Sequence, residues 1–318
     1  MTLKSHPATD RVLNNPDLTD AQKISKLQTM ALKAYPSSPV QNYMRQAYRS
    51  LQTKGETPKG HASALFAEHP STGKTADDIV KDFPGMAEKI AAVKKKIAAG
   101  TATDKLHKRD GEYTPERKAL HSKIIRSLLS PDAVARATPP PGQKPTVTFL
   151  GGRGGSGKSW LTKKGEGPVD GEHAIILNSD DVQEHLPEYQ GWNAAHTHDE
   201  AAEIVENVEN VARGAGLNVI LDATMRSEGG VKKKLERFQK AGYDVKGYYM
   251  FLPPEEAAKR ALQRYDRGGE KGRYVPPEYT LGSTANEKNF DSFMPSFKQW
   301  GVYKNTGKSP ELVKEGGS

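Results

Sequence analysis

Residues 149–160 read FLGGRGGSGKSW, and this stretch constrains the fold more than any other part of the chain. Five glycines surround a Lys-Ser pair directly after an apolar run, and residues 152–159 fit the pattern G-x-x-x-x-G-K-[ST]. Glycines let backbone N–H groups turn inward around an anion, and the pattern has this meaning where a strand precedes the loop. The preceding run TVTFLGG supplies that strand, so the stretch predicts a loop that holds a nucleotide phosphate.

From Val147 onward the chain alternates between short apolar runs and helical patterns. Further strands are predicted over 173–181, 217–224 and 244–252. Helical spacing fills the intervals between and after them, over 199–216, 229–243 and 253–265. This alternation predicts an α/β fold of the P-loop kinase-like class, with a mainly parallel sheet flanked by helices. Ligands of such sheets bind beyond the carboxyl ends of the strands.

The front of the chain has a different character. Residues 1–140 hold 23 Lys and Arg against 14 Asp and Glu, although the whole chain carries a net charge of only +8. Apolar residues at helical spacing over 18–35, 38–52 and 75–100 predict helices, whereas 101–113 reads as a loop. We therefore expect a smaller, basic, all-helical region over residues 1–111, of unknown role, and a second domain over 112–318. The basic region is either a solvated set of helices or a module that binds nucleic acid or an acidic partner.

Composition excludes several classes of protein. The chain has no cysteine, so disulfides and thiolate metal sites are ruled out. No apolar run approaches the roughly 18–20 residues of a membrane helix, and the N-terminus lacks the apolar segment of a secretion signal. The simplest expectation is a soluble cytoplasmic protein that does not act at a membrane.

The glycine loop predicts the residues that hold ATP. Lys158 is placed to reach the β- and γ-phosphates, and the Ser159 hydroxyl is placed to ligate Mg²⁺. The full predicted nucleotide set is Gly152, Gly154, Gly155, Ser156, Gly157, Lys158 and Ser159.

Carboxylates end the next two predicted strands. Asp222 follows the run NVIL and resembles an acid that holds Mg²⁺, directly or through water. Asp180 is placed to accept a proton from a substrate hydroxyl, the role that phosphoryl transfer to an alcohol requires. An aspartate at a strand end also serves as a helix cap or turn residue, and we prefer that structural interpretation for Asp181.

Arginines gather in KRALQRYDRGGEKGRYVPP, where a helix runs into a glycine-rich loop. A mobile lid of this kind closes over phosphates and brings arginine to the developing charge. The arginines are Arg260, Arg264, Arg267 and Arg273. A solvated basic helix explains Arg260 alone, but not all four.

In this order, the glycine loop, Asp180, ILDATMR and the arginine-bearing segment resemble the zeta toxin family of P-loop kinases, above all versions in phage and prophage proteins. The resemblance covers residues 112–318 and includes GGRGGSGKS, LNSDDVQEHLPEY and ENVARGAGLNVILDATMR. It implies ATP-dependent phosphorylation of the sugar 3′-hydroxyl of UDP-N-acetylglucosamine. It also implies a separate small helical antitoxin as partner, and we expect an antitoxin or a phage structural protein to bind this chain.

Read across by motif, the resemblance implies that Asp180 is the catalytic base. Contacts to the nucleotide sugar are implied for Glu206, Thr224 and Arg226. Arg273 is implied as a phosphate-binding lid arginine, and a second one is Arg264 or Arg267. The loop departs from the family pattern at Arg153, where zeta toxins often have a proline. TLGSTANEKNF, after the lid, lacks a histidine that is common in relatives.

Two alternatives remain open at this point. In the first, the chain is a polynucleotide or nucleoside kinase whose basic N-terminal region binds nucleic acid. In the second, it is a nucleotide-binding structural phage protein. A further hypothesis is that residues 1–111 block the site in cis or dock the chain to an assembly. A purely structural protein needs neither Asp180 nor a lid, which favours an enzyme.

Overall fold

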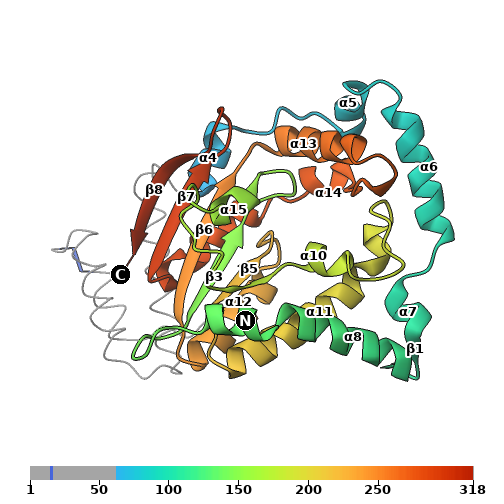
Figure 1. The fold of residues 1–318 in the computed structure, drawn as a ribbon. Helices are drawn as coiled ribbons and strands as arrows, with labels where there is room; N and C mark the ends of the chain where they lie inside the picture. The colour runs from blue at the N-terminus through green and yellow to red at the C-terminus, as the bar shows by residue number, and fades with distance from the viewer. Residues whose placement is uncertain (1–14, 17–61, 318) are drawn as a thin grey trace. The chain divides into compact units, whose positions relative to one another are not determined.

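The computed structural model describes residues 15–16 and 62–317, and the predicted helices over 18–35 and 38–52 lie outside this part. Within it, one six-stranded sheet has the order β4-β5-β3-β6-β7-β8 (Figure 1). Its strands are β3 (Thr146–Gly151), β4 (Ile175–Leu177), β5 (Val219–Asp222), β6 (Asp244–Phe251), β7 (Gln299–Lys304) and β8 (Glu311–Gly317). All neighbours pair in parallel except β7 and β8. The predicted α/β fold with a mainly parallel sheet is confirmed.

Two strands are absent from the sequence prediction, the edge strand β8 and its neighbour β7. β8 (ELVKEGG) is mostly polar and carries no buried residue, because it lies at the edge of the sheet. β7 is buried only at Gly301, Val302 and Tyr303. Neither segment therefore shows the apolar run by which a central strand is recognised.

One face of the sheet carries the main core. Val147, Phe149 and Tyr249 belong to this cluster, together with side chains from the helices that cover the face. The covering helices are α4 (Ala62–Glu68), α8 (Pro115–Leu128), α9 (Pro131–Ala137), α11 (Ala194–Gly214), α12 (Glu228–Lys240) and α15 (Asn286–Phe293). Helix α8 begins at a threonine cap, with the Thr114 side chain accepting a hydrogen bond from Arg117 N and Pro115 in the first turn.

Among the described residues, the opposite face has a much thinner cover. Leu150, Ile220 and Met250 pack there against Leu161 of the short 3₁₀ helix η1 (Lys158–Thr162) and against nearby Val169. The sequence indicates a short helix after the glycine loop, and the structure has only this 3₁₀ helix. The chain turns back at once, since Gly167 N donates to Lys163 O at 2.8 Å and a Cβ on Gly167 would lie 2.3 Å from Leu161 O.

A second cluster joins the front helices to the arginine-bearing segment. Ile79 of α5 (Ala76–Lys81) and Ile90 of α6 (Met86–Ala99) pack with Leu262 of α13 (Pro254–Arg267) and with Tyr274. The 3₁₀ helix η2 (Gly269–Lys271) and α14 (Pro277–Leu281) follow α13, and Figure 1 shows α6 alongside α13 and α14. The helices predicted over 75–100 are thus confirmed as α5 and α6.

The segment expected to be a loop, residues 101–113, contains a short helix and a hairpin instead. These are α7 (Thr103–His107), β1 (Lys108–Arg109) and β2 (Glu112–Tyr113). Asp110, with a positive φ of 52°, and Gly111, with φ 84°, make the turn between the two strands. Two-residue Asp-Gly turns of this kind close antiparallel hairpins, so the DG pair is the sequence signal for this element.

Residues 60–318 form one compact unit. The described helices before residue 111 contact the elements after it, and the predicted boundary at 111 stays a prediction. Within the described residues, no helix combines the length and apolarity needed to cross a membrane.

Candidate active site

The glycine loop lies between the carboxyl end of β3 and η1, and three of its residues, Gly152, Gly155 and Gly157, have a positive φ that only glycine tolerates well. Gly155 has φ 90°, and a Cβ there would lie 2.3 Å from Ala257 O at the start of α13. Gly157 has φ 86°, and a Cβ there would lie 2.5 Å from Asn305 Nδ2. The loop is therefore pressed against α13 and the end of β7, leaving Gly154 with open space around it.

Arg153 holds the loop from behind. Its side chain is only 1% exposed and turns into the protein, where it forms a bidentate pair with Glu287 of α15. Tyr249 Oη donates to the same carboxylate at 2.8 Å, and the guanidinium lies over the Phe66 ring, 5.4 Å from its centroid. Of the two cations in the glycine pattern, Arg153 thus anchors the loop, and Lys158 is left to face a phosphate.

Asn305 fixes the other side of the loop. Its side-chain Nδ2 donates to Ser156 O at 2.8 Å, and its backbone carbonyl oxygen accepts from Arg260 Nη2 at 3.1 Å. Arg260 therefore supports the loop through Asn305, which sequence reasoning did not single out. Ser156 Oγ is buried and finds no partner among the described residues. An acceptor-rich triphosphate fits this combination of a glycine cradle, an orphan hydroxyl and a nearby lysine.

Lys158 meets a carboxylate from the neighbouring strand. Asp222 ends β5 beside Leu150 of β3, and its Oδ1 lies 3.7 Å from Lys158 Nζ. Asn178, after β4, donates to Asp222 Oδ2 at 3.3 Å. The structure thus brings two of the predicted site residues together at one edge of the sheet.

The predicted Mg²⁺ ligands are only two protein groups. Ser159 is exposed on η1 and Asp222 is half-buried. Across the described residues, no group of three or more His, Cys, Asp or Glu side chains is placed to hold a metal ion. Mg²⁺ normally keeps water and nucleotide phosphates as most of its ligands, so a hydroxyl and one carboxylate are a donor set that fits it.

Asp180 is joined to the lid by Arg273. It lies in the first turn of α10 (Ser179–Gln183), where the Asn178 side chain caps the helix by accepting from Asp180 N at 2.9 Å. Arg273 Nη1 lies 2.5 Å from Asp180 Oδ1 and donates to Gln183 Oε1 at 3.0 Å. Gln183 is buried and its side-chain amide donates to Ala194 O at 2.6 Å. This hydrogen bond fixes the Gln183 Oε1 atom that accepts from Arg273.

Arg264, rather than Arg267, is the second arginine near this pair. Partial burial and the adjacent Arg273 cation lower the pKa of Arg264, while Asp180 and Tyr189 act in the opposite direction. Arg267 is exposed at the end of α13, and no contact joins it to Asp180 in the described part of the chain. Asp181 contacts the Asn178 amide at 3.4 Å, and burial with the nearby Asp222 and Asp180 carboxylates raises its pKa.

The loop after β5 contains two of the predicted acceptor-side residues. Met225 has a positive φ of 59°, which is strained for a residue with a side chain. Asn289 of α15 holds this conformation by donating to the carbonyl oxygens of Met225 and Arg226 at 2.8 and 2.9 Å. The Arg226 guanidinium lies over the exposed Tyr279 ring, 4.5 Å from its centroid, and Thr224 Oγ1 accepts from Arg226 N at 3.4 Å.

Glu206 is not brought to this loop. It lies on α11 and pairs with Arg237 of α12 at 2.8 Å. Arg237 is nine residues beyond Glu228, the first residue of α12, and so lies roughly 14 Å further along the helix. Its ion pair with Glu206 is therefore well away from the loop after β5. Sequence reasoning missed four residues that support the site, because an isolated residue after the lid belongs to no motif. They are Tyr279, Glu287, Asn289 and Asn305.

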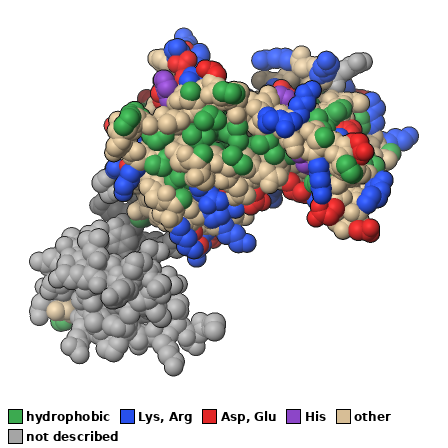
Figure 2. All heavy atoms as spheres, turned by 60° about the horizontal axis from the view of Figure 1, so that its bottom comes forward, with side chains coloured by type: hydrophobic (Ala, Val, Ile, Leu, Met, Phe, Trp, Pro, Cys, Tyr) green, Lys and Arg blue, Asp and Glu red, His purple; other side chains and the backbone are tan. Residues whose placement is uncertain are grey.

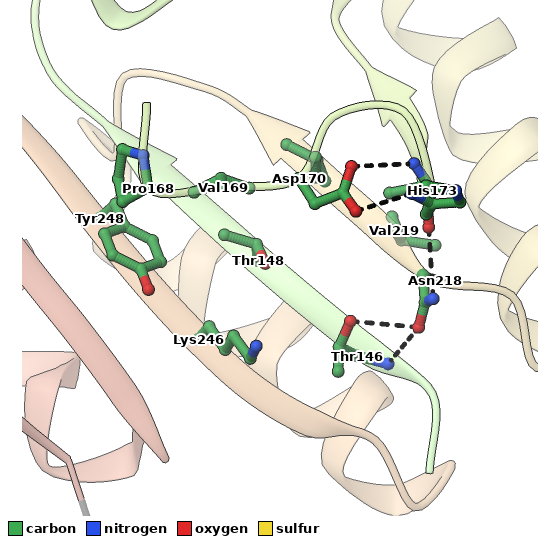
Figure 3. A pocket seen from close by; sticks show the side chains of 12 residues that line it. Thr146, Thr148, Pro168, Val169, Asp170, His173, Asn218, Val219, Lys246 and Tyr248 are labelled. Atoms are coloured by element: carbon green, nitrogen blue, oxygen red, sulfur yellow. Dashed lines mark hydrogen bonds and ion pairs between the residues drawn. The ribbon is translucent and has the colours of Figure 1, made fainter. Parts of the chain in front are cut away.

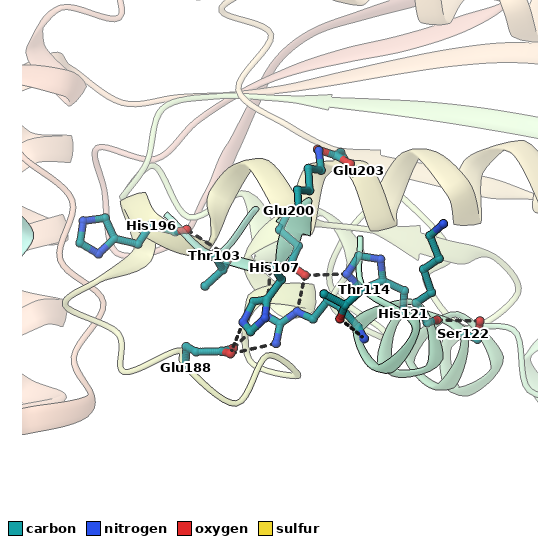
Figure 4. A network of polar contacts seen from close by, with 12 residues as sticks. Thr103, His107, Thr114, His121, Ser122, Glu188, His196, Glu200 and Glu203 are labelled. Atoms are coloured by element: carbon teal, nitrogen blue, oxygen red, sulfur yellow. Dashed lines mark hydrogen bonds and ion pairs between the residues drawn. The ribbon is translucent and has the colours of Figure 1, made fainter. Parts of the chain in front are cut away.

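A polar network supports the segment between α10 and α11 (Figure 4). Arg117 of α8 makes bidentate contacts with both Glu188 and Glu200 at 2.6–2.9 Å. His121 Nε2 lies 2.6 Å from Glu200 Oε1, and His107 Nε2 lies 2.8 Å from Glu188 Oε1. The hydrogen bonds from His121 and Arg117 lower the pKa of Glu200 despite its burial, so this fully buried carboxylate stays charged.

Comparisons with known proteins bear on the family and the fold. The family model described as Zeta toxin matches residues 131–308. Toxin PezT of Streptococcus pneumoniae serotype 4 is 24% identical over 148 residues, which span 43% of this chain and 58% of that protein. The AvrRxo1-ORF1:-ORF2 complex with ATP shares 19% identity over 68% of this chain and 76% of that one, with a TM-score of 0.56. The AvrRxo1-ORF1:AvrRxo1-ORF2 complex with sulphate ions shares 19% identity over 78% of this chain and 73% of that one, with a TM-score of 0.54.

Proposed function

This chain belongs to the zeta toxin family, and from that membership we propose that it is an ATP-dependent kinase acting on a sugar hydroxyl of UDP-N-acetylglucosamine or a related nucleotide sugar. The observation that carries the proposal is the meeting of Lys158, Asp222 and the Asp180–Arg273 pair beyond the carboxyl ends of three adjacent strands. A phosphate site, a strand-end acid and a base under an arginine-bearing lid are the parts that phosphoryl transfer to an alcohol requires.

Each group has a definite task in this proposal. The loop amides and Lys158 bind and orient the β- and γ-phosphates, and Ser159 and Asp222 would hold Mg²⁺. ATP supplies the phosphoryl group. Asp180 accepts the proton of the acceptor hydroxyl, and its contact with Arg273 joins this base to the lid. Arg273 and Arg264 then stabilise the charge that develops on the transferring group.

On the acceptor side we assign Thr224 and Arg226. The strained Met225 conformation fixes both neighbours, and the exposed Tyr279 ring beside Arg226 offers a face for a sugar or a base. Glu206 is left out of this assignment because its ion pair with Arg237 of α12 holds it away from the loop after β5. A separate antitoxin is the proposed partner, supported by the solved two-protein complexes of the AvrRxo1 relative.

The test is phosphoryl transfer by the full chain with Mg·ATP and UDP-N-acetylglucosamine, with products resolved by mass. We expect a product one phosphate heavier. Asp180→Ala should lower its formation by at least about 100-fold while ATP binding persists, because general-base catalysis contributes roughly 10²–10⁴. Asp181→Asn is the matched control, because this adjacent carboxylate contacts Asn178 and not Arg273.

A second arm replaces the sugar nucleotide with a short oligonucleotide. Figure 2 shows Lys and Arg side chains interspersed with Asp and Glu at the margins of one face of the described residues, with hydrophobic side chains gathered in its middle. Nothing in that view favours a nucleic-acid acceptor. Phosphorylation of the oligonucleotide, with none of the sugar nucleotide, would overturn the proposal.

A further inference from the structure

Gln183 is a buried amide one turn beyond Asp180, the proposed base. It lies three residues after Asp180 in α10, and residues with this spacing share one face of a helix. Its side chain is fully buried, and glutamine is a residue type that is mostly found exposed. Buried polar atoms are nearly always hydrogen-bonded, so neighbouring groups have to satisfy this amide.

The hollow over β3 and β6 offers a contrast (Figure 3). Thr148 and Tyr248 are mostly buried there, but solvent reaches their hydroxyl oxygens and can satisfy them. Solvent does not reach the Gln183 amide, so protein groups alone determine how it is bonded.

Both polar atoms of the Gln183 side chain are occupied. Nε2 donates to the carbonyl oxygen of Ala194, the first residue of α11, at 2.6 Å. Oε1 accepts from Arg273 Nη1 at 3.0 Å. An amide offers a donor and an acceptor at once, whereas an ionised carboxylate would set an oxygen against the Ala194 carbonyl oxygen. The contact with Ala194 therefore determines which atom of Gln183 faces Arg273.

The Arg273 guanidinium is held through one of its nitrogens. Nη1 lies 2.5 Å from Asp180 Oδ1, so this nitrogen contacts both polar side chains of α10. Nε is buried and has no partner among the described residues. Nη2 makes no hydrogen bond in that part of the chain and is open to solvent. The contacts with α10 therefore leave Nη2 free to donate to a phosphoryl oxygen.

The neutrality of Gln183 matters as much as its length. Asp180 already places one carboxylate beside Arg273. A second carboxylate in place of Gln183 would weaken further the attraction between the guanidinium and a phosphoryl group. A neutral acceptor fixes the direction of the guanidinium and leaves its charge for the transferring group.

The carbonyl group that orients Gln183 is itself held in place. Thr197 is buried in α11, and its Oγ1 also donates to Ala194 O, at 3.3 Å. The side chain of Asn193, the residue before α11, donates to Glu188 O at 2.8 Å. Gln183 thus joins the lid to a well-supported helix end rather than to a free loop.

We propose that Gln183 is a positioning residue for phosphoryl transfer, which holds the Arg273 guanidinium against α10 with Nη2 free for the transferring group. The inference rests on the kinase function proposed above and adds to it a buried residue that contacts neither substrate. Because Gln183 acts only through Arg273, its effect on catalysis should vanish when Arg273 is absent.

Gln183→Met keeps the length of the side chain and removes both amide contacts. In the phosphoryl-transfer assay with the full chain, kcat should fall at least about 10-fold while KM for ATP stays within about twofold, because a misplaced group that acts in the transition state lowers kcat. Gln183→Glu should also lower kcat, since its carboxylate opposes Ala194 O and offsets the Arg273 charge. Thr197→Val is the matched control, because it removes another buried hydrogen bond to Ala194 O and should keep the parental kcat.

A double-mutant cycle with Arg273→Ala separates positioning from general loosening of the site. In the Arg273→Ala background, Gln183→Met should change kcat by less than about twofold, since residues that act as a unit are not additive. A further fall as large as that in the parent background would overturn the proposal.

A second measurement does not depend on the reaction. Side-chain NMR of the ligand-free full chain reports rotation of the Arg273 guanidinium, whose signal is assigned by its loss in Arg273→Ala. We expect slow rotation in the parent and in Thr197→Val, and faster rotation in Gln183→Met. Equal rotation in the parent and Gln183→Met would overturn the proposal. Faster rotation in Gln183→Met, with no transfer to a sugar nucleotide by the parent, would support the hold on Arg273 and count against the proposed acceptor instead.

Discussion

At the scale of single residues, the buried Arg153–Glu287 pair links the glycine loop to a distant helix. Both side chains are at most 2% exposed, and Tyr249 completes the hydrogen bonding of the carboxylate. Attraction within such a pair offsets the desolvation of both charges, so removal of one partner is far more harmful than removal of both. The glycine loop therefore depends on a residue 134 positions later in the chain.

Glu287→Gln should destabilise the protein by about 3–5 kcal/mol, because it leaves the Arg153 cation buried against a neutral group. We also expect a higher KM for ATP, since the loop loses its anchor. The paired replacement of Arg153 and Glu287 by Met should recover much of the lost stability in urea unfolding. If the single and paired replacements were equally unstable, burial of an unpaired charge would not be the cause.

Asp291 predicts a pH dependence of stability. It accepts from Ala62 N and Ser63 N at the start of α4, yet burial raises its pKa to about 6. The native state then binds more protons than the unfolded state between about pH 4 and pH 6, so this group's contribution to the free energy of unfolding falls as pH rises across that interval.

Urea unfolding of the parent and of Asp291→Asn at a series of pH values measures this effect. The stability of the parent relative to the variant should fall by about 2–3 kcal/mol between pH 4 and pH 7, given about 1.4 kcal/mol per pKa unit. Parallel pH profiles for the two proteins would show that Asp291 does not titrate in this range.

At the scale of elements, α5 and α6 act on the lid. Three ion pairs, Lys89–Asp266, Lys94–Glu278 and Asp82–Lys259, tie them to α13 and α14. These pairs are largely exposed and contribute little each. The shared apolar cluster that contains Ile90 and Leu262 is the stronger link. Because α13 carries Arg264 and leads to Arg273, packing of α6 sets the position of both arginines.

Ile90→Ala should destabilise the protein by about 2–4 kcal/mol through the cavity that it leaves in this cluster. Loosening should concentrate in the lid, so limited proteolysis should cut between residues 268 and 273 faster than in the parent. Lys95→Ala, at an exposed position of the same helix, is the control and should be cut at the parental rate. Equal cutting of all three proteins would mean that α6 does not position the lid.

The central strands, α8 and the glycine loop could be predicted from sequence because each carries a local signal. β3 and β6 are apolar runs, α8 has a threonine cap followed by proline, and the loop has a spaced motif. The supports of the site could not be predicted in this way. Asn305 and Asn289 act through contacts with segments more than 60 residues away, and an isolated asparagine has no periodicity by which it could be recognised.

The difference between Arg264 and Arg267 is likewise a matter of distant contacts. Both fit a lid motif by type and spacing, and the sequence left the choice open. Three residues along a helix amount to nearly one turn, and both side chains are exposed, so the two differ in the charged groups that lie near each of them. The Arg273 cation lowers the pKa of Arg264, and the Asp180 carboxylate acts in the opposite direction.

At the scale of the whole molecule, the described helices before residue 111 complete the core of the kinase-like part of the chain. Ala62 and Leu65 of α4 belong to the main cluster, and Ile79, Met86, Ile90 and Val93 supply half of the second one. Removal of these residues would expose apolar surface on α13 and α15. The predicted domain boundary at 111 can therefore be tested by stability.

A chain truncated to 112–318 should unfold at a lower temperature than one truncated to 60–318, by at least about 5 °C, because about 1 kcal/mol shifts the midpoint of such a domain by 2–4 °C. Thermal unfolding followed by circular dichroism measures the difference. The longer fragment retains the compact unit and is the control. Equal midpoints would support a boundary at 111 and would make residues 62–111 dispensable for folding.

The buried pair behind the glycine loop also has a consequence for how this sequence can diverge. Position 153 carries a cation only if position 287 supplies a carboxylate, because either charge alone would be stranded in the interior. A lineage that exchanges Arg153 for a proline must lose the acid at 287 in nearly the same step. The two positions should therefore co-vary among descendants of this protein, and the intermediates with one charge should be rare.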